Sequence, residues 1–289
     1  MAGHLIAVDW GTTNRRVYLL DEGGQVLATA RDDRGIKAMP RSGYLSETAS
    51  LRQRYGDLPI ILAGMVGSAR GWIEVPYLPC PIGLGELAAG LSWVEPGRTA
   101  IVPGLAHPDG DVMRGEEVQF LGAHASGLTT GGGLLCQPGT HCKWARLEQG
   151  RIGQFSTAMT GELFALLKSH SLLAEFLIGA VSDDQSFRDG VQDGLSGRLP
   201  RDLFRVRAAA LLGHRTVSQS ASFVSGLLIG HDVGGVGFDQ GEQVSIIADP
   251  ELGGLYASAV RIAGGKSQII DSQAVFVSGI AQLWKARRS

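Results

Sequence analysis

Cysteine is scarce in this chain of 289 residues, and only Cys80, Cys136 and Cys142 are present. An odd number of cysteines without a C-x-x-C pair argues against a disulfide framework and against a structural zinc site. His141 directly precedes Cys142, and two neighbouring side chains are poorly placed to close one tetrahedral metal site. We therefore expect neither disulfides nor zinc.

Long apolar runs are also missing, since no stretch reaches the ~18 apolar residues that a membrane helix needs. The opening residues MAGHLIAVDW contain no basic segment followed by a long apolar run, which argues against a signal peptide. The net charge is -2, so electrostatics favour neither nucleic acid nor an anionic membrane as a partner. We expect a cytoplasmic protein that binds small molecules and that could form a homodimer.

Glycine, by contrast, is abundant, with 42 residues, about twice the usual frequency. These glycines are scattered and predict tight turns and close backbone approaches. The chain length suits two packed lobes. Short apolar runs joined by Gly turns over residues 5–28 predict antiparallel strands, and the later alternation of helices and strands predicts an α/β architecture.

Apolar spacing and turn signals predict the remaining elements. Thr160 is the expected N-cap of a helix over 160–178, and Ser182 with Gln185 forms a capping box for the next helix. Further helices are expected at 44–55, 116–125, 199–212, 216–233 and 273–288, and one more follows the segment DPELGG and ends at about 262. Further strands are expected at 59–63, 99–102, 134–137, 244–248 and 268–270.

The first candidate site is the segment IAVDWGTTN, in which a strand ends at Asp9 and a turn follows over Gly11, Thr12, Thr13 and Asn14. Backbone N–H groups and hydroxyls at such a turn can bind phosphate oxygens. A carboxylate beside them can hold Mg²⁺, so Asp9 is the candidate metal ligand. The alternative is a plain hairpin turn whose polar side chains bond their own backbone.

The second candidate is DVMRGEEVQFLGA, where Arg114 and Gly115 lead into a helix whose first turn carries Glu116 and Glu117. A kinase that phosphorylates an alcohol needs a carboxylate to orient the hydroxyl and accept its proton. Acidic residues in a first turn also stabilise a helix without any catalytic role. The residues alone leave both explanations open.

The third candidate is QPGTHCKW, a turn after a strand in which Gly139 and Thr140 can approach a phosphate and Lys143 can neutralise it. His141 in the same turn is a further candidate for nucleotide binding. The alternative is a surface turn with an exposed lysine, because Pro-Gly marks turns in general.

The fourth candidate is the loop GMVGSARGW, which contains Gly67, Ser68, Arg70 and Trp72. A guanidinium binds a carboxylate through two hydrogen bonds, so Arg70 suits an acidic substrate. Trp72 can pack on the carbon skeleton of a sugar. A solvated arginine and a core tryptophan are the structural alternatives.

These strings resemble, in the same order, those of the 2-dehydro-3-deoxygalactonokinase family. The resemblance covers nearly the whole chain and includes IAVDWGTTN, GMVGS, VMRGEE, PGTHCKW, MTGELFALL, SGLLIG and IIADPELGGLY. It implies an α/β, two-lobed, actin-like ATPase (ribonuclease H-like) fold with an ATP cleft between the lobes. The N-terminal lobe would comprise residues 1–125 and a returning helix at 273–289, and it would hold the first phosphate hairpin and the sugar-acid site. The C-terminal lobe would comprise residues 126–272 and would hold the second phosphate loop and the adenine site.

The family resemblance also implies a reaction, the transfer of the γ-phosphate of ATP to the 6-hydroxyl of 2-dehydro-3-deoxy-D-galactonate in galactonate catabolism. ATP and Mg²⁺ are the implied cofactors. Many related kinases use Asp as base, and the matching place here favours Glu116, with Glu117 second. The implied adenine loop contains Ala248, Asp249 and Gly253, and Gly67, Ser68, Arg70, Trp72 and Arg114 are implied to bind the sugar acid.

Two alternatives stay open at this point. One is a kinase for another sugar acid, such as 2-keto-3-deoxygluconate. The other is a non-enzymatic ATP-binding switch with the actin fold, which would bind ATP without sugar-dependent turnover.

Overall fold

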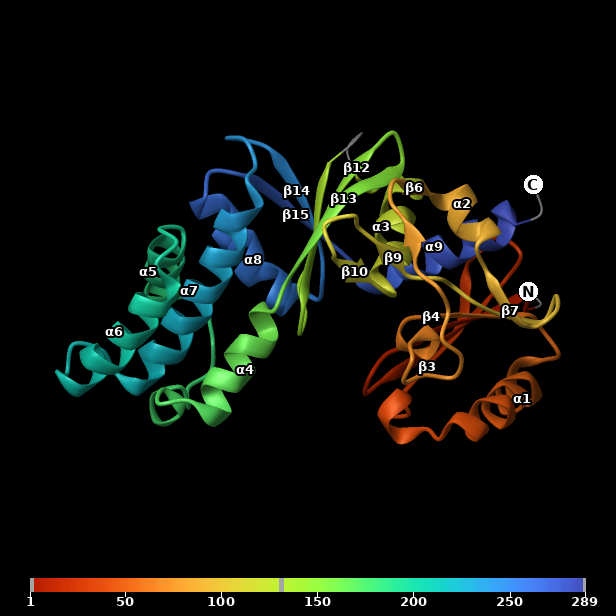
Figure 1. Ribbon diagram of the computed structural model, residues 1–289, viewed down its shortest axis with the longest axis horizontal. Coiled ribbons are helices and arrows are strands. Elements are labelled where there is room, and N and C mark those ends of the chain that lie inside the picture. Colours follow the sequence, from red (N-terminus) through yellow and green to blue (C-terminus); the bar gives the residue numbers. More distant parts are fainter. Residues whose placement is uncertain (1–2, 130–132, 288–289) are drawn as a thin grey trace. The chain divides into compact units, whose positions relative to one another are not determined.

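The computed structural model describes residues 3–129 and 133–287, which belong to two compact units (Figure 1). Unit 1 comprises Met1–Gly132, Ala145–Phe155 and Ser272–Ser289, and unit 2 comprises Gly133–Trp144 and Ser156–Asp271. Residues 126–129 and 145–155 group with unit 1, whereas the sequence-based boundaries placed them in the C-terminal lobe. The assignment of functional lobes stays a prediction.

Unit 1 is built on a six-stranded sheet with the order β3-β2-β1-β4-β8-β7. Strands β1, β2 and β3 form the antiparallel arrangement that the sequence predicts, and β1, β4 and β8 run parallel. The strands are β1 (Leu5–Trp10), β2 (Arg15–Leu20), β3 (Val26–Asp32), β4 (Ile60–Ala63), β7 (Ser92–Glu95) and β8 (Thr99–Ile101).

The two faces of this sheet are covered by different helices. Helix α1 (Tyr44–Tyr55) packs Tyr44 and Leu51 into one apolar cluster with Ile6 and Val8 of β1. On the other side, α9 (Ser272–Ala286) contacts β1, and its Phe276 ring lies 5.7 Å from the ring of Tyr18 in β2. Helix α3 (Glu116–Ala125) packs along α9.

Shorter elements complete unit 1. A three-stranded sheet has the order β10-β9-β5. The short elements are η1 (Ile36–Ala38), η2 (Arg41–Gly43), η3 (Met65–Gly67), β5 (Leu78–Pro79), β6 (Ile82–Gly83), α2 (Leu84–Ala89), β9 (Leu105–Ala106) and β10 (Val112–Met113). Sequence patterns do not predict the two-residue strands, because a pair of residues shows no alternation.

Unit 2 contains the strands β11, β14 and β15, the first residues of β12 and the last residues of β13, and the strand order is β15-β14-β11-β12-β13. Strands β11 and β15 flank β14 in parallel. The strands are β11 (Leu134–Gln137), β12 (Cys142–Glu148), β13 (Arg151–Ala158), β14 (Gln243–Ile247) and β15 (Lys266–Ile270). The sequence analysis missed β12, because this strand begins within PGTHCKW, which carries strong turn signals. It also missed β13.

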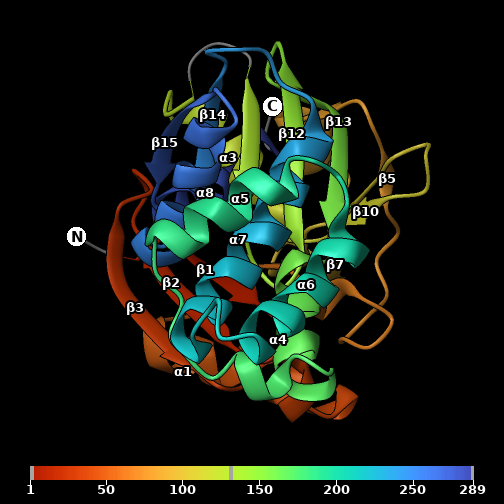
Figure 2. The same ribbon diagram turned by 90° about the vertical axis from the view of Figure 1, so that its left-hand side faces the viewer.

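Helices cover the unit 2 sheet in layers. Helices α7 and α8 share one apolar core with β11 and β14, and α5 packs along α7 (Figure 2). The helices are α4 (Thr160–His170), η4 (Ala174–Phe176), α5 (Gln185–Gly194), α6 (Leu199–Leu211), α7 (Val217–Val236) and α8 (Pro250–Ile262).

Two expected helix starts are wrong in detail. The residue before α4 is Met159, and the Thr160 hydroxyl donates to Asp232 instead of capping the helix. Helix α4 also ends at His170, and a short 3-10 turn follows. Helix α5 is capped by Asp184, whose carboxylate accepts a hydrogen bond from Phe187 N at 2.9 Å.

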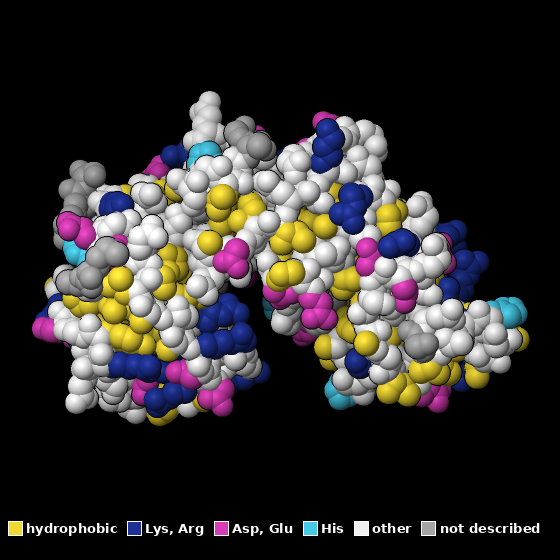
Figure 3. Space-filling model, turned by 180° about the vertical axis from the view of Figure 1, so that it is seen from behind, with side chains coloured by type: hydrophobic (Ala, Val, Ile, Leu, Met, Phe, Trp, Pro, Cys, Tyr) yellow, Lys and Arg dark blue, Asp and Glu magenta, His cyan; other side chains and the backbone are white. Residues whose placement is uncertain are grey.

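The surface seen in Figure 3 carries Lys and Arg in small groups interspersed with Asp and Glu, not as one continuous basic face. That distribution matches the net charge of -2. Within residues 3–129 and 133–287, no helix has both the length and the apolar character needed to cross a bilayer.

Candidate active site

The turn between β1 and β2 presents Thr12, Thr13 and Asn14 at the surface of unit 1. The N–H of Gly11 donates to the carbonyl oxygen of Asn14 at 2.9 Å and closes the turn. Backbone N–H groups of residues 35–37 donate to the carbonyl oxygens of residues 11–13 at 3.0–3.2 Å. The segment 35–37, which the sequence analysis missed, therefore fixes the turn by donating to the carbonyl oxygens of the turn, and it leaves the threonine side chains exposed.

Asp9 lies at the end of β1, opposite Ala63 in the parallel strand β4. Its side chain is 22% exposed and forms an ion pair with Arg16 at 3.2 Å. Burial raises the pKa of Asp9, and the neighbouring Arg16 opposes that shift. Mg²⁺ in kinases is held by one or two carboxylates together with substrate phosphates, so a single partly exposed carboxylate beside a phosphate turn fits such an ion.

The beginning of α3 reaches the same edge of the sheet. Gly64 follows β4 with φ 92°, and Gly115 precedes α3 with φ 111°. A Cβ atom on Gly115 would lie 3.1 Å from the Cα of Gly64, and one on Gly64 would lie 3.5 Å from Oδ1 of Asp9. The sequence-predicted carboxylates Asp9, Glu116 and Glu117 therefore belong to one local region of unit 1.

The two glutamates of α3 differ in their surroundings. Glu116 is half-buried, and its Oε2 accepts a hydrogen bond from Arg114 N at 3.0 Å. Glu117 is fully buried, and its Oε2 accepts a hydrogen bond from Gly115 N at 2.6 Å. Burial, assisted by the neighbouring Glu116, raises the pKa of Glu117 to about 8. Glu117 is therefore mainly protonated at neutral pH, whereas Glu116 is accessible.

The raised pKa of Glu117 predicts a pH-dependent stability. The folded state binds this proton more tightly than the unfolded state, so the contribution of Glu117 is fully present below pH 4.5 and is lost as the pH rises towards 8. Relative to Glu117→Gln, the wild-type free energy of unfolding should fall by up to ~1.4 kcal/mol per pH unit in that window. Urea unfolding of both proteins at pH 5, 6.5 and 8 measures it, and parallel pH profiles would contradict it.

The loop after β4 holds the residues expected to bind the sugar acid. Arg70 is exposed and Ser68 is half-buried. Arg114 is 8% exposed and donates through Nη2 to the carbonyl oxygen of Val75 at 2.6 Å. Among the described residues its Nε and Nη1 atoms have no hydrogen-bond partner. A Cβ on Gly67 would lie 2.9 Å from Nη1 of Arg114 and 2.9 Å from Cγ2 of Ile101, so the Arg114 side chain packs directly against this glycine.

Trp72 does not have the environment expected of a tryptophan that packs on a sugar. Its ring is stacked on Tyr44 with the centroids 5.6 Å apart, and it packs against the apolar core of unit 1. The structural alternative, a core tryptophan, fits this contact. A role in sugar binding stays a prediction.

In unit 2 the turn between β11 and β12 contains Gly139, Thr140 and His141. Thr140 is exposed, and its carbonyl oxygen accepts a hydrogen bond from Glu162 N at 2.9 Å. His141 Nε2 lies 2.6 Å from Oε2 of Glu162. Lys143 is 6% exposed in β12 and donates to Thr157 Oγ1 at 2.5 Å, so it is not the exposed turn lysine of the alternative.

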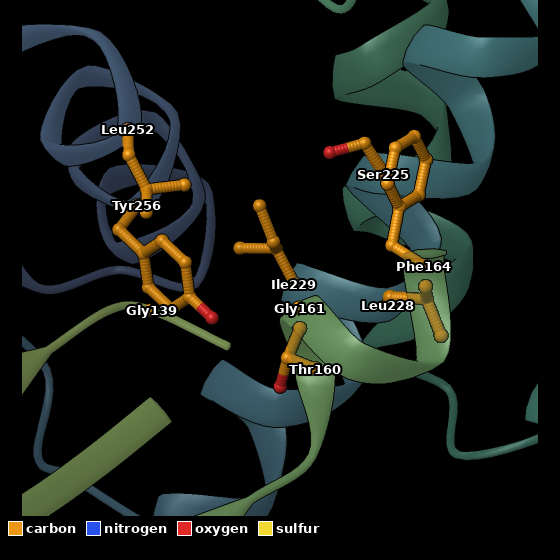
Figure 4. A pocket seen from close by; sticks show the side chains of 9 residues that line it. All are labelled: Gly139, Thr160, Gly161, Phe164, Ser225, Leu228, Ile229, Leu252 and Tyr256. Carbon is orange, nitrogen blue, oxygen red and sulfur yellow. The ribbon is translucent and has the colours of Figure 1, made fainter. Parts of the chain in front are cut away.

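A pocket of about 350 Å³, with its mouth included, opens beside this turn. Figure 4 shows Leu252 and Tyr256 of α8 on one side and Phe164 and Leu228 on the other. Its mainly apolar lining with a few polar groups is typical of a small-molecule site. The lining residues are Gly139, Thr160, Gly161, Phe164, Ser225, Leu228, Ile229, Leu252 and Tyr256.

The expected adenine loop borders α8. Asp249 caps that helix by accepting hydrogen bonds from Glu251 N and Leu252 N, while Ala248 and Gly253 are buried. The pocket instead uses Leu252 from this loop. Most lining residues were not predicted, although many belong to the strings MTGELFALL, SGLLIG and IIADPELGGLY. The sequence shows that these strings resemble the family, but it does not show which of their side chains lie together in the fold.

Among the described residues no group of three or more His, Cys, Asp or Glu could hold a metal ion. Cys136 and Cys142 are buried free thiols whose Sγ atoms lie 3.6 Å apart. Burial raises the pKa of both thiols, which disfavours the thiolate that a nucleophile or a zinc ligand requires.

The fold recurs in distant proteins. The activator of the 2-hydroxyisocaproyl-CoA dehydratase from Clostridium difficile, solved with bound ADPNP, matches with a TM-score of 0.51 and 11% identity over 99% of this chain and 96% of its own. Component A of the (R)-2-hydroxyglutaryl-CoA dehydratase from Acidaminococcus fermentans matches with a TM-score of 0.50 and 11% identity over 99% of both chains. The predicted α/β actin-like ATPase fold is confirmed.

Much closer relatives carry the name that the motifs suggest. A probable 2-dehydro-3-deoxygalactonokinase of Rhizobium meliloti is 35% identical over 99% of this chain and 98% of its own length. The 2-dehydro-3-deoxygalactonokinase of Escherichia coli is 34% identical over 98% of both. A crystal structure of a Sinorhizobium meliloti protein assigned to the same activity matches with a TM-score of 0.87 and 35% identity over 99% of this chain and 98% of its own.

The family model described as 2-keto-3-deoxy-galactonokinase matches residues 9–283, which includes every candidate site residue. Kinases of this family use ATP, so the alternative of a non-enzymatic switch is set aside. The chain therefore belongs to the 2-keto-3-deoxy-galactonokinase family and is an ATP-dependent carbohydrate kinase.

Proposed function

We propose that this kinase transfers the γ-phosphate of ATP to the 6-hydroxyl of 2-dehydro-3-deoxy-D-galactonate, giving 2-dehydro-3-deoxy-6-phosphogalactonate in galactonate catabolism. The observation that carries this proposal is the full-length similarity to relatives named for that substrate. The acidic edge of unit 1 supports it, because phosphorylation of an alcohol needs a carboxylate close to a phosphate turn.

Glu116 is the proposed base. It lies at the first position of α3 and remains half-buried, whereas Glu117 is fully buried. A deprotonated carboxylate can orient the acceptor hydroxyl and take up its proton as the bond to phosphorus forms. Glu117 then acts as a neutral group that holds Gly115 N and thereby shapes the beginning of the helix.

Phosphate binding is assigned to each unit separately. In unit 1 the Gly11–Asn14 turn, with Thr12 and Thr13 exposed, would contact phosphate oxygens, and Asp9 would hold Mg²⁺. When bound, Mg²⁺ neutralises charge on the phosphates. In unit 2 Gly139 and Thr140 contact phosphate, assisted by His141 and Lys143.

The nucleoside is assigned to the pocket beside Gly139. Its apolar walls at Phe164, Leu228 and Leu252 suit a purine ring, and the hydroxyl of Ser225 offers a polar contact. Asp249 fixes the first turn of α8 and so the place of Leu252.

Arg70 is the proposed partner of the substrate carboxylate, and Arg114 supports the same loop through Val75. We expect Arg70→Ala to raise KM for the sugar acid by about tenfold, since a charge-assisted pair is lost, and to leave KM for ATP nearly unchanged. Steady-state kinetics with each substrate varied in turn measure both constants. Arg31→Ala, an exposed arginine on β3, is the matched control. Equal increases in the two KM values for Arg70→Ala would refute the assignment.

Product analysis tests the proposed reaction. ATP, Mg²⁺ and either 2-dehydro-3-deoxygalactonate or its gluconate epimer are incubated with the protein, and phosphorus–proton NMR locates the new ester. The proposal predicts a 6-phosphate and a higher kcat/KM for the galacto acid. A higher kcat/KM for the gluco acid would favour the other sugar-acid kinase, and an ester at another carbon would refute the proposed position.

A further inference from the structure

A buried carboxylate lies behind the pocket of unit 2 and belongs to none of the groups assigned so far. Asp232 is on α7, a helix whose residues pack into the core of the unit, and it is 8% exposed. A carboxylate in such a place is strongly unfavourable unless its oxygens accept hydrogen bonds. Its partners therefore indicate what it does.

Three neutral donors from three different elements meet at this carboxylate. Trp144 Nε1 of β12 donates to Oδ1 at 2.9 Å. The hydroxyls of Thr160 and Tyr256 donate to Oδ2 at 2.8 and 2.9 Å. Hydrogen bonds to an ionised acceptor are roughly twice as strong as those between neutral groups. Asp232 thus joins β12, α4 and α8 at one point.

Two of these donors also line the pocket. Thr160 and Tyr256 are lining residues, and Figure 4 shows them beside Gly139. Because each hydroxyl is held by the same oxygen of Asp232, the carboxylate sets the separation of α4 and α8 at the pocket wall. Moving Asp232 would move both walls.

The first turn of α4 extends this control to the turn between β11 and β12. A Cβ on Gly161 would lie 2.3 Å from the carbonyl oxygen of Gly139, so the helix and the turn are in backbone contact. Glu162 N also donates to the carbonyl oxygen of Thr140 at 2.9 Å. The position of α4, fixed through Thr160, therefore determines the position of Gly139 and Thr140.

We propose that Asp232 is a positioning residue for nucleotide binding, which acts through Thr160 and Tyr256 on the pocket and on the Gly139–Thr140 turn. The identity of the ligand rests on the proposed function, in which this pocket takes ATP. Asp232 itself is not among the residues that line the pocket. The four residues of this network all belong to unit 2.

Three variants separate positioning from general stability. Asp232→Ala removes all three acceptor contacts. Asp232→Asn keeps the shape, because its oxygen can accept from Trp144 while its amide donates to the hydroxyl oxygens of Thr160 and Tyr256. Asp189→Ala removes an exposed acid of α5 and is the matched control. Calorimetric titration with ADP and steady-state kinetics are recorded for each.

We expect Asp232→Ala to raise the ADP dissociation constant and KM for ATP by about tenfold or more, as the loss of charge-assisted hydrogen bonds implies. KM for the sugar acid should change less than about twofold, within ordinary surface effects. Asp232→Asn should recover most of the affinity, and Asp189→Ala should match wild type.

Unchanged ADP affinity in Asp232→Ala, or equal increases in both KM values, would overturn the proposal. If Asp232→Ala does not fold, Thr160→Val and Tyr256→Phe delete one donor each, and wild-type ADP affinity in both would likewise overturn it. A different result would refute the proposed function: wild-type protein that binds ADP but phosphorylates no sugar acid. The ADP titrations still decide the role of Asp232 in that case.

Discussion

Replacing Glu116 by Gln is expected to lower kcat by about 10²-fold or more, because a general base is lost while its shape is kept. KM for ATP and for the sugar acid should change little, since the amide still accepts the hydrogen bond from Arg114 N. Initial rates at saturating substrates measure the effect. Turnover close to wild type would remove Glu116 from this role.

Glu117→Gln is the matched control for that experiment. Glu117 is mainly protonated at neutral pH, so an amide resembles its native form and can still accept the hydrogen bond from Gly115 N. We expect kcat within about threefold of wild type, which is the size of a small local adjustment. A large loss in Glu117→Gln with normal turnover in Glu116→Gln would transfer the catalytic role to Glu117.

Of the substitutions considered for this protein, Gly122→Ala is expected to lower the free energy of unfolding the most. Helices α3 and α9 touch through their backbones at this point, and a Cβ on Gly122 would lie 2.1 Å from the carbonyl oxygen of Val275. A backbone atom cannot move aside as a side chain does, so the helices must separate. Overpacking of this kind costs ~1–3 kcal/mol or more. Because α3 carries Glu116, kcat should fall as well.

Gly85→Ala is the control, since it adds the same methyl group to helix α2 with no atom within 4 Å. Alanine is favoured over glycine inside a helix by up to ~1 kcal/mol, so this variant should be neutral or slightly more stable. Thermal unfolding and kcat of both variants are compared with wild type. A melting temperature of Gly122→Ala equal to that of Gly85→Ala would contradict the close packing of α3 on α9.

Elements with a clear period were predictable from the sequence. Helix α1 has the expected bounds, and β4 and α3 differ from expectation by at most one residue, because apolar spacing and glycine turns mark them. The helix from Thr160 was predicted too long because Leu172, Leu173 and Leu177 continue an apolar pattern. In the structure these residues follow the end of α4 at His170, and Leu173 and Leu177 pack into a cluster with α7.

Candidate site residues were predictable only where a side chain with suitable chemistry lies at the end of a predicted strand or the start of a predicted helix. Asp9, Glu116 and Glu117 carry the right groups at the ends of elements, and parallel pairing of β1 with β4 brings Asp9 level with Ala63, just before Gly64. The difference between Glu116 and Glu117 was not predictable, because burial depends on contacts with distant residues. The need for glycine at Gly35 arises in the same way, since a Cβ there would lie 2.4 Å from Thr13 C.

Asp232 shows most clearly which contacts the sequence alone does not predict. Its position on α7 is 88 residues from Trp144 and 72 from Thr160 in the chain, and only the folded backbone brings the three together. A single aspartate in an apolar helix indicates that a partner exists without naming it. The strings that resemble the family nevertheless contain all three of its donors, Trp144 in PGTHCKW, Thr160 in MTGELFALL and Tyr256 in IIADPELGGLY.

The central claim is that ATP and a sugar acid react on this chain. The most direct test is ADP release measured with ATP and Mg²⁺, with and without 2-dehydro-3-deoxygalactonate. We predict release that depends on the sugar acid and saturates with it. ADP release at the same rate without the acid, or none with it, would contradict the account.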